Sequence, residues 1–477
     1  MTKTTPEHVR MTKQNPQPTQ GVKDLLGDPK KSLIKLAIPM VIAMTLQTLY
    51  NLVDAFWVSL LGADHLAAVG FVFPFFILIM AIGVGIGTGA TSAISRRIGA
   101  QDKKGADNVA DHSIILSIIL AIATTIPLYL LAPSIFSALG AGPTVGPLAT
   151  GYAQVIFLGI FFMILNNLGS SILRGEGDMK RAMYVLLLSS LINIILDPIF
   201  ILPQFLNMGV VGAAIATVIA LIFSCIPLIY WLIIKKDTYV TINVKAFRFK
   251  KDILIDILKV GLPASASQLS MSLMMFLING IIILINTTNG VAIFSTGFRI
   301  ATLAMMPTMG LMSALIAVAG ATYGAQHYSK TSIVHLHGVK LGLIFEIIVA
   351  VFIFLCAPYI AAAFTLSADT QILYQGLVDF LRIWSFEFIA IPLGMLSSGL
   401  FQGVGKGNNA LLVTINRAII LGPLFAYVLG ALVFQDLNGI WWGVVIGNIL
   451  GSTIAFVWAR HYLKNLLKSH PQPQSIS

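Results

Sequence analysis

The sequence predicts an all-α integral membrane protein, and three observations support that class: the composition, twelve long apolar runs and the distribution of basic residues. Of the 477 residues, 57% are hydrophobic and only 10% are charged. The mean hydropathy is +0.88. A soluble domain carries roughly 25% charged residues. So few charges cannot cover a water-facing surface, so lipid is the solvent that suits most of this one.

Each of the twelve runs is long enough to cross a bilayer, which takes about 20 apolar residues. Backbone polar groups in lipid must be hydrogen-bonded within the segment, which favours helices. The connections are short, so little soluble structure is expected. The predicted spans are 33–60, 66–95, 109–132, 146–173, 180–203, 209–234, 253–285, 290–322, 332–357, 372–402, 408–433 and 438–462.

Basic residues occur in alternate connections. Lys and Arg precede the first span and follow every even-numbered span, whereas the other loops hold Asp64, Asp369 and Asp436 but no basic residue. The positive-inside rule therefore predicts a multi-pass protein of the inner or plasma membrane with both termini in the cytoplasm. The net charge of +11 is spread over many short loops, so no nucleic-acid-binding face is expected.

An internal repeat divides the chain into two halves. Lys35-Leu-Ala-Ile-Pro39 returns as Lys259-Val-Gly-Leu-Pro263, and four further landmarks follow in order at offsets of about 224 to 228, among them Gly99-Ala-Gln101 with Gly324-Ala-Gln326. Six spans per half give both halves one orientation, related by a pseudo-two-fold axis along the membrane normal. Parallel repeats of this kind are a transporter architecture.

The repeat and the polar segments predict the domain organisation. Residues 1–28 are polar without an apolar core, so we expect a disordered cytoplasmic tail and not a cleavable signal peptide. A six-helix lobe over 29–236 and a second over 252–466 are joined by a cytoplasmic linker over 237–251. A cytoplasmic tail covers 467–477.

Asp54 and Asp197 lie deep inside apolar runs. A carboxylate at bilayer depth is costly and usually binds a cation, relays a proton or meets a charged substrate. The two aspartates do not stand alone, because further polar residues share their helix faces at a spacing of three or four or lie on neighbouring spans. These are Gln47, Tyr50, Asn51, Tyr152, Asn166, Asn167, Asn193 and Thr217.

Pro198 follows Asp197 directly, and its missing amide proton frees the carbonyl of Ile194. Two carboxylates, an amide, a hydroxyl and this carbonyl form an all-oxygen set, which suits a hard cation. A proton could serve instead, because two nearby carboxylates titrate as a pair. The alternative is that Asp54 and Asp197 only hydrogen-bond neighbouring helices, although asparagine would do so at less cost.

The second half lacks this set, because Gly422 stands where the first half has Asp197. Cation binding is therefore expected in the first half alone. Other charges lie within spans, and they include Glu387, Asp379 and Arg382. The sequence assigns them no role in transport, but of these residues Glu387 is the one expected to touch a cavity. Asp379 and Arg382 are three residues apart and could pair on one helix face.

Neither an enzyme nor a nucleotide-driven pump is expected. The histidines are scattered and the spans show no nucleophile–base pair. The glycine run from Gly83 to Gly89 has no preceding strand, so close helix packing explains it better than a phosphate loop. No Gly-x-x-x-x-Gly-Lys-Ser/Thr motif occurs. An ion gradient is therefore the expected energy source, with no cofactor beyond Na+ or H+.

With these features the chain resembles the MATE (multidrug and toxic compound extrusion) exporters. Asn51-Leu-Val-Asp54 and Arg174-Gly-Glu-Gly-Asp178 resemble that family, and Asn193-Ile-Ile-Leu-Asp197-Pro198 resembles its DinF branch, particularly archaeal and bacterial members. The likeness covers about residues 30–465. In the NorM branch an acidic residue occupies the place of Ile391, one turn from Glu387, so the departure favours the DinF branch.

The resemblance implies a cation-coupled antiporter that exports organic, often cationic amphiphiles by alternating access. It implies a cation site at Asp54, Asn193, Asp197 and Thr217. It implies a substrate-facing set at Gln47, Tyr50, Tyr152, Asn166 and Asn167, and a bending proline at Pro39. The expected partners are small organic molecules and membrane lipid, and the functional unit is a monomer. A lipid-linked precursor flippase of the same superfamily is the alternative, but it would need basic residues in its cavity.

Overall fold

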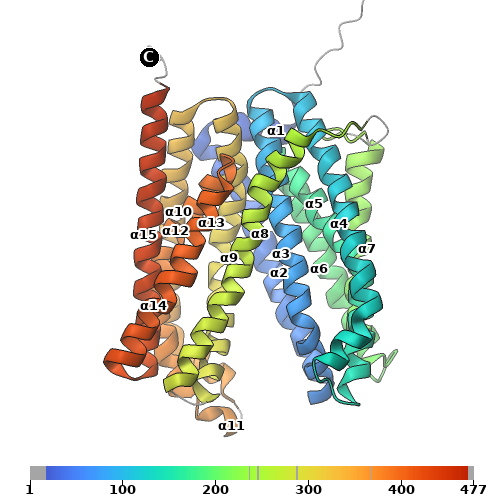
Figure 1. Cartoon of the computed structure of the whole chain (residues 1–477), viewed down its shortest axis with the longest axis vertical. Helices are drawn as coiled ribbons and strands as arrows, with labels where there is room; N and C mark the ends of the chain where they lie inside the picture. Colours follow the sequence, from blue (N-terminus) through green and yellow to red (C-terminus); the bar gives the residue numbers. More distant parts are fainter. Residues whose placement is uncertain (1–17, 236, 244–246, 286–287, 367, 471–477) are drawn as a thin grey trace, which may run out of the picture.

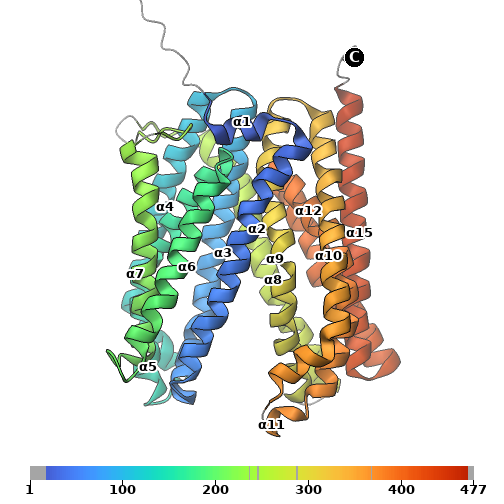
Figure 2. The same cartoon turned by 180° about the vertical axis from the view of Figure 1, so that it is seen from behind.

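Two bundles of membrane-length helices stand side by side in the computed structural model, which describes residues 18–235, 237–243, 247–285, 288–366 and 368–470 (Figures 1 and 2). The described residues contain no strand, and twelve of their helical segments are long and apolar enough to cross a membrane. The predicted class, twelve helices in two six-helix lobes, is confirmed.

The first bundle, here the N-lobe, has six membrane-length helices. They are α2 (Pro29–Ser59), α3 (Ala63–Gly99), α4 (Lys103–Ala138), α5 (Val145–Gly175), α6 (Met179–Ile201) and α7 (Gly209–Ile229), the last continued by the π-helical η1 (Tyr230–Lys235). Most of these helices are longer than the predicted apolar runs, because their polar ends continue beyond them.

The second bundle, the C-lobe, repeats the pattern with one irregular span. Its regular helices are α8 (Lys251–Ile285), α9 (Thr288–Gly324), α10 (Tyr328–Phe364), α12 (Tyr374–Gly403) and α15 (Leu437–Ser469), with the short α11 (Ala368–Gln371) before α12. Its eleventh span alternates α-helical with wider π-helical turns: α13 (Gly407–Thr414), η3 (Ile415–Leu421), α14 (Gly422–Ala426) and η4 (Tyr427–Phe434).

The described part of the predicted N-terminal tail contains a helix, so the prediction of disorder over 1–28 is wrong for α1 (Gln20–Leu26). Thr19 caps this helix by accepting from the Val22 amide, and the side chains of Val22 and Leu25 are buried. The two buried side chains lie three residues apart on one face, so they dock this short helix against the core. Residues 1–17 lie outside the described residues.

The repeat also appears in the backbone. Gln101 after α3 and Gln326 after α9 are 225 positions apart and both adopt positive φ, 57° and 58°. Gly177 and Gly405 end the fourth span of each lobe with φ of 83° and 80°. Left-handed residues are uncommon in a chain, and at glutamine they need local support. Their recurrence at equivalent places indicates that the two lobes share backbone geometry as well as sequence.

The lobes contact each other through α3 against α8 and α9 and through α2 against α9. A side chain on Gly99 would collide with the carbonyl oxygen of Ala321, and one on Gly324 with that of Arg96. The Ser92 hydroxyl donates to the Gln402 carbonyl at 2.5 Å. These contacts hold the lobes together at the end of the molecule where both termini lie (Figure 1).

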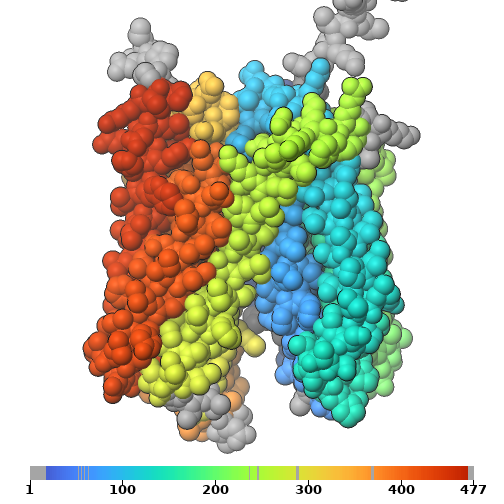
Figure 3. Space-filling model, viewed as in Figure 1, coloured from blue at the N-terminus to red at the C-terminus, as the bar shows by residue number. Residues whose placement is uncertain are grey.

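The glycine run of α3 serves this packing, as expected. Gly85 and Gly89 face α8, where a side chain would meet Ser265 and the Ile257 carbonyl, whereas Gly87 faces Ser171 of α5. Toward the opposite end the lobes part and leave a cleft between them (Figure 3). The molecule is therefore closed at the end near the termini and open at the other.

Candidate functional site

Asp54 of α2 and Asp197 of α6 meet inside the N-lobe, where these two helices pack together. Asp197 is fully buried, and its carboxyl lies within hydrogen-bonding reach of the Asp54 carboxyl. Two ionised carboxylates cannot hydrogen-bond each other and repel strongly at this range. Their contact therefore requires a shared proton or a cation between them.

Asn193 and Thr217 complete the set around Asp197. The Asn193 amide satisfies its neighbours best when its nitrogen donates to Asp197 Oδ2 at 2.7 Å and its oxygen accepts from Thr217 Oγ1 at 3.1 Å. The Thr217 hydroxyl also lies 3.0 Å from the Ala213 carbonyl. The structure thus brings the four predicted cation ligands together across α2, α6 and α7. Among the described residues, no group of three His, Cys, Asp or Glu side chains suggests a different metal centre.

The two tyrosines of the predicted substrate set border the carboxyl pair. The Tyr50 hydroxyl hydrogen-bonds Thr217, and Tyr152 of α5 lies close enough for both carboxyl charges to act on its hydroxyl. Gln47 is half-buried one turn before Tyr50 on α2, whereas Asn51 is exposed. Aromatic rings beside an acidic pair are a surface on which an organic cation can rest.

Asn166 and Asn167 of α5 have other partners. Asn166 is buried and its amide donates to the Ser224 hydroxyl on α7. Asn167 lies 3.4 Å from the Met163 carbonyl and faces Gly83 of α3. Both amides take part in contacts within or between helices, and none of these contacts reaches the carboxyl pair. The assignment of Asn166 and Asn167 to the substrate-facing set therefore stays a prediction. Their contacts are separate from those of the two tyrosines.

Pro39 lies inside α2, ten residues after its first residue, and the helix runs on through it. It is therefore not a helix-start proline. Gly310 of α9 packs against Val41 so closely that a side chain there would meet its backbone. The proline thus lies beside the contact between the lobes, on the same helix as Asp54.

The Arg174-Gly-Glu-Gly-Asp178 segment joins α5 to α6. Its first two residues end α5, whereas Glu176, Gly177 and Asp178 lie between the two helices. Glu176 Oε2 accepts from the Val240 amide at 2.9 Å, and Asp178 caps α6 by accepting from the Arg181 amide at 3.1 Å. Burial raises the pKa of Glu176 to about 8. The motif therefore holds the start of the linker between the lobes against the N-lobe, and the sequence did not indicate this role.

The C-lobe has a different buried polar cluster, which the sequence indicated only in part. The Asn448 amide of α15 donates to Glu387 Oε1 at 2.9 Å, and Arg417 of η3 lines the same cavity. The cavity measures about 10 Å³, room for about one water. Asn448 was missed because a lone amide in an apolar run gives no pattern.

Asp379 and Arg382 do not pair with each other in the structure. Asp379 accepts from Gln375 at 3.1 Å, and the Arg382 guanidinium lies over the Phe354 ring, 5.8 Å from its centroid. Arg382 is exposed and extends toward α10, so the two side chains diverge.

Comparison with known proteins decides the family. The MatE family model matches this chain twice, over residues 39–199 and 263–428, one match in each lobe. The chain belongs to the MatE (MATE) family. The predicted resemblance and the internal repeat are both confirmed by this double match. The chain is a multi-pass membrane transporter of the multidrug efflux class and not an enzyme.

Relatives of the MATE chain cover almost its whole length. The multidrug export protein MepA of Staphylococcus aureus (strain bovine RF122 / ET3-1) is 25% identical over 429 residues, 90% of this chain and 92% of MepA. The crystal structure of a MATE protein in complex with MaL6 is 45% identical, with a TM-score of 0.92 over 94% of this chain and all of that one.

A third relative has been linked to another function. It is a MOP superfamily transporter from Pyrococcus furiosus, described for a reverse polarity of its binding pocket that suggests a different function. It is 44% identical, with a TM-score of 0.91 over 94% of this chain and 99% of its own. The polarity of the pocket in the present chain therefore bears on its function.

Proposed function

We propose that this MATE protein is a secondary antiporter that couples entry of Na+ or H+ to export of organic, often cationic amphiphiles. The observation that carries the proposal is the approach of the Asp54 and Asp197 carboxyls within one buried pocket. An uncompensated acidic pair in a low-dielectric lobe needs a positive partner, and a coupling ion and a cationic substrate can each supply it.

Alternating access follows if the ion and the substrate favour different arrangements of the lobes, because a ligand shifts a conformational equilibrium only by its differential affinity. The alternation of basic loops supports an arrangement with both termini in the cytoplasm of an inner or plasma membrane. The cleft in Figure 3 then opens to the outside, and the chain is in an outward-facing state. Pro39, beside the contact between α2 and α9, is a suitable place for α2 to bend during closure.

The polarity of the N-lobe pocket favours this function over a lipid-linked precursor flippase. Among the described residues, the groups around the carboxyl pair are carboxyl, amide, hydroxyl and phenol, with no Lys or Arg. Pyrophosphate recognition calls for clustered basic side chains. We infer that the monomer is the working unit, because each lobe completes its own site, with no cofactor beyond the coupling ion.

Efflux from proteoliposomes tests the proposal. Wild-type protein should export a fluorescent aromatic cation under an imposed Na+ gradient or an imposed pH gradient, and applying each gradient alone identifies the ion. Asp54→Asn and Asp197→Asn should abolish coupled export while the proteins fold normally. Asp379→Asn is the matched control, since this carboxyl lies in another span, and it should transport as the wild type does. Near-normal export by both pocket variants would refute the assignment.

A further inference from the structure

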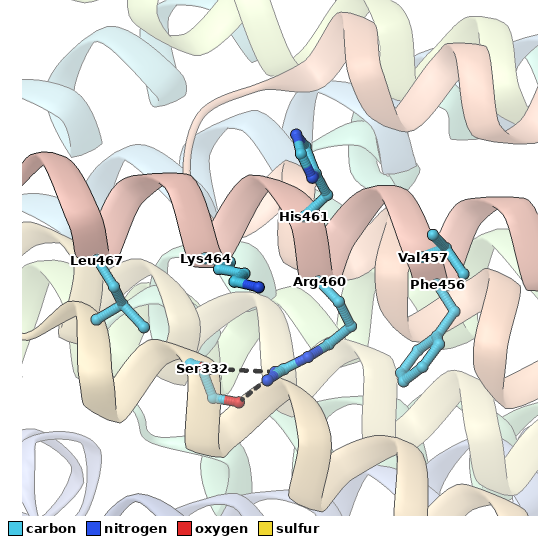
Figure 4. Close-up of a pocket in the computed structure, with 7 residues that line it drawn as sticks. All are labelled: Ser332, Phe456, Val457, Arg460, His461, Lys464 and Leu467. Atoms are coloured by element: carbon cyan, nitrogen blue, oxygen red, sulfur yellow. Dashed lines mark hydrogen bonds between the residues drawn. The ribbon is translucent and has the colours of Figure 1, made fainter.

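A groove on the C-lobe lies outside the transport pocket, between the start of α10 and the end of α15 (Figure 4). Its volume is about 400 Å³. One side is formed by Ser332 of α10 and the other by residues of α15, namely Phe456, Val457, Arg460, His461, Lys464 and Leu467. The groove therefore combines basic side chains with an apolar wall.

Arg460 is held in place across this groove. Its Nη1 donates to the Ser332 hydroxyl at 3.0 Å and to the Ser332 carbonyl at 3.2 Å. Both bonds use one nitrogen, and a guanidinium has two further nitrogens that can donate in the same plane. In Figure 4 the Lys464 side chain lies on the same side of α15 as Arg460, whereas His461 points away. A fixed guanidinium beside a flexible ammonium is suited to grip an anion.

The positive charge of Arg460 and Lys464 has no acidic counterpart among the described residues of the groove. The whole of α15 lacks Asp and Glu, and in α10 the first acidic residue is Glu346, fourteen positions after Ser332. The described residues that line the groove include no carboxylate. Positive charge near membrane ends is expected from topology alone, but topology does not require a guanidinium fixed between two helices. The charge of the groove is therefore available to an external anion.

The apolar wall indicates which anion. Val457 lines the groove, and Ile454 and Leu450 continue from it along α15 toward the middle of the span, outside the groove. The three side chains are 59%, 52% and 43% exposed. Arg460 lies nine residues before the last residue of α15, about 13 Å along the helix. Basic side chains at the membrane edge above a lipid-facing apolar ridge match a phosphate headgroup above its acyl chains.

We propose that the groove between α10 and α15 binds an anionic phospholipid from the leaflet on the side of the termini. Arg460 and Lys464 hold the headgroup phosphate. The acyl chains follow Val457, Ile454 and Leu450. The site is independent of the ion coupled to transport and of the exported compound.

Native mass spectrometry of the full-length protein in neutral detergent tests this site. The protein should bind phosphatidylglycerol and discriminate against phosphatidylcholine. Each basic group near the membrane surface contributes about a fivefold gain in affinity for an anionic lipid. Arg460→Gln with Lys464→Gln should therefore weaken phosphatidylglycerol binding by about 25-fold. If that double variant does not fold, Lys464→Gln alone should cost about fivefold, because Lys464 is exposed.

The matched control is Lys104→Gln with Lys180→Gln, which removes two exposed charges from the same end of the N-lobe. It should leave phosphatidylglycerol binding unchanged. Equal weakening by the control pair would show diffuse surface attraction and overturn the proposal. Inorganic phosphate should fail to displace the lipid, since it lacks the acyl chains. Displacement by phosphate at the concentration that works for a soluble short-chain phosphatidylglycerol would also overturn it.

Discussion

The two lobes share a backbone but bury opposite kinds of polar site. In the N-lobe, Asp54 and Asp197 approach each other, and the described groups around them are amide, hydroxyl and phenol, with no basic side chain among these. In the C-lobe, Glu387 shares its small cavity with Arg417 and accepts from Asn448. The C-lobe carboxylate thus has a positive charge built into the protein, whereas the N-lobe pair must obtain one from outside.

This difference shows how a repeat can keep its packing and change its electrostatics. The symmetric glycine contacts at Gly99 and Gly324 occur in both lobes, but Gly422 replaces Asp197 and the π-helical η3 presents Arg417. The i→i+5 hydrogen bonds of π-helical turns differ from those of an α-helix, so η3 departs from the regular α6 of the N-lobe. Responsiveness to a cation is therefore expected in the N-lobe, and the C-lobe cluster is expected to stabilise the fold.

The largest expected difference between the N-lobe carboxyl pair and the C-lobe cluster is the effect of their substitution on transport. Asp197→Asn is expected to abolish coupled efflux, a loss of at least about tenfold, which corresponds to ~1.4 kcal/mol or more. Glu387→Gln should keep most of it, because the amide oxygen can still accept from Asn448. The double variant of Asp54 and Asp197 should be no worse than either single one, since the pair acts as a unit. The measurement is the efflux rate from proteoliposomes, normalised to the amount of folded protein. Equal losses of efflux in Asp197→Asn and Glu387→Gln would contradict the proposed difference between the lobes.

Stability should show the reverse order. Glu387→Ala leaves Arg417 buried without an opposite charge and should cost about 3–5 kcal/mol. Asp197→Asn removes a carboxylate that lacks a built-in partner and should cost far less. Thermal unfolding in detergent provides the measurement. Asp379→Ala, on the same helix as Glu387, is the control, and a larger loss for Asp197→Asn than for Glu387→Ala contradicts the comparison.

The shared packing predicts an equal effect in both lobes. Gly99→Ala and Gly324→Ala each place a methyl group against a carbonyl of the other lobe, so each should cost about 1–3 kcal/mol. The glycine Gly280 has no atom within 4 Å of such a methyl group, so Gly280→Ala should not destabilise. Melting temperatures of the three variants test the pseudo-symmetry, and a loss at only one of the two contact glycines would break it.

A pH-dependent difference should separate the connecting segments. Glu176 has Val404 as its counterpart in the C-lobe. Because burial raises the pKa of Glu176 from 4.5 to about 8, the folded protein keeps a proton that the unfolded chain releases. Stability should therefore decline as pH rises from 4.5 to 8, by at most about 1.4 kcal/mol per pH unit. The free energy of unfolding, measured from pH 4.5 to 8, should no longer decline in Glu176→Gln, whereas Asp252→Asn should keep the decline. An unchanged slope in Glu176→Gln would argue against a protonated Glu176 in the folded protein.

The sequence alone determined the class, the repeat and the carboxyl pair, because each leaves a periodic or compositional signal. Apolar runs of membrane length dictate helices, since lipid offers no hydrogen bonds to an open backbone. The spacing of Asn193 and Asp197 placed both on one face of α6. Ionised groups within apolar runs are costly, so Asp54 and Asp197 stood out without any structure.

Only the tertiary structure decided which polar groups meet. In the folded protein, Thr217 of α7 hydrogen-bonds Asn193 of α6, and Asn166 donates to Ser224. Asp379 and Arg382 contact different partners. The tertiary structure also formed the C-lobe cluster, docked α1 by two apolar side chains and opened the cleft at one end only. Such pairings depend on how helices distant in the chain rotate and pack, and helix rotation leaves no trace in a uniformly apolar sequence, because the membrane accepts any apolar face.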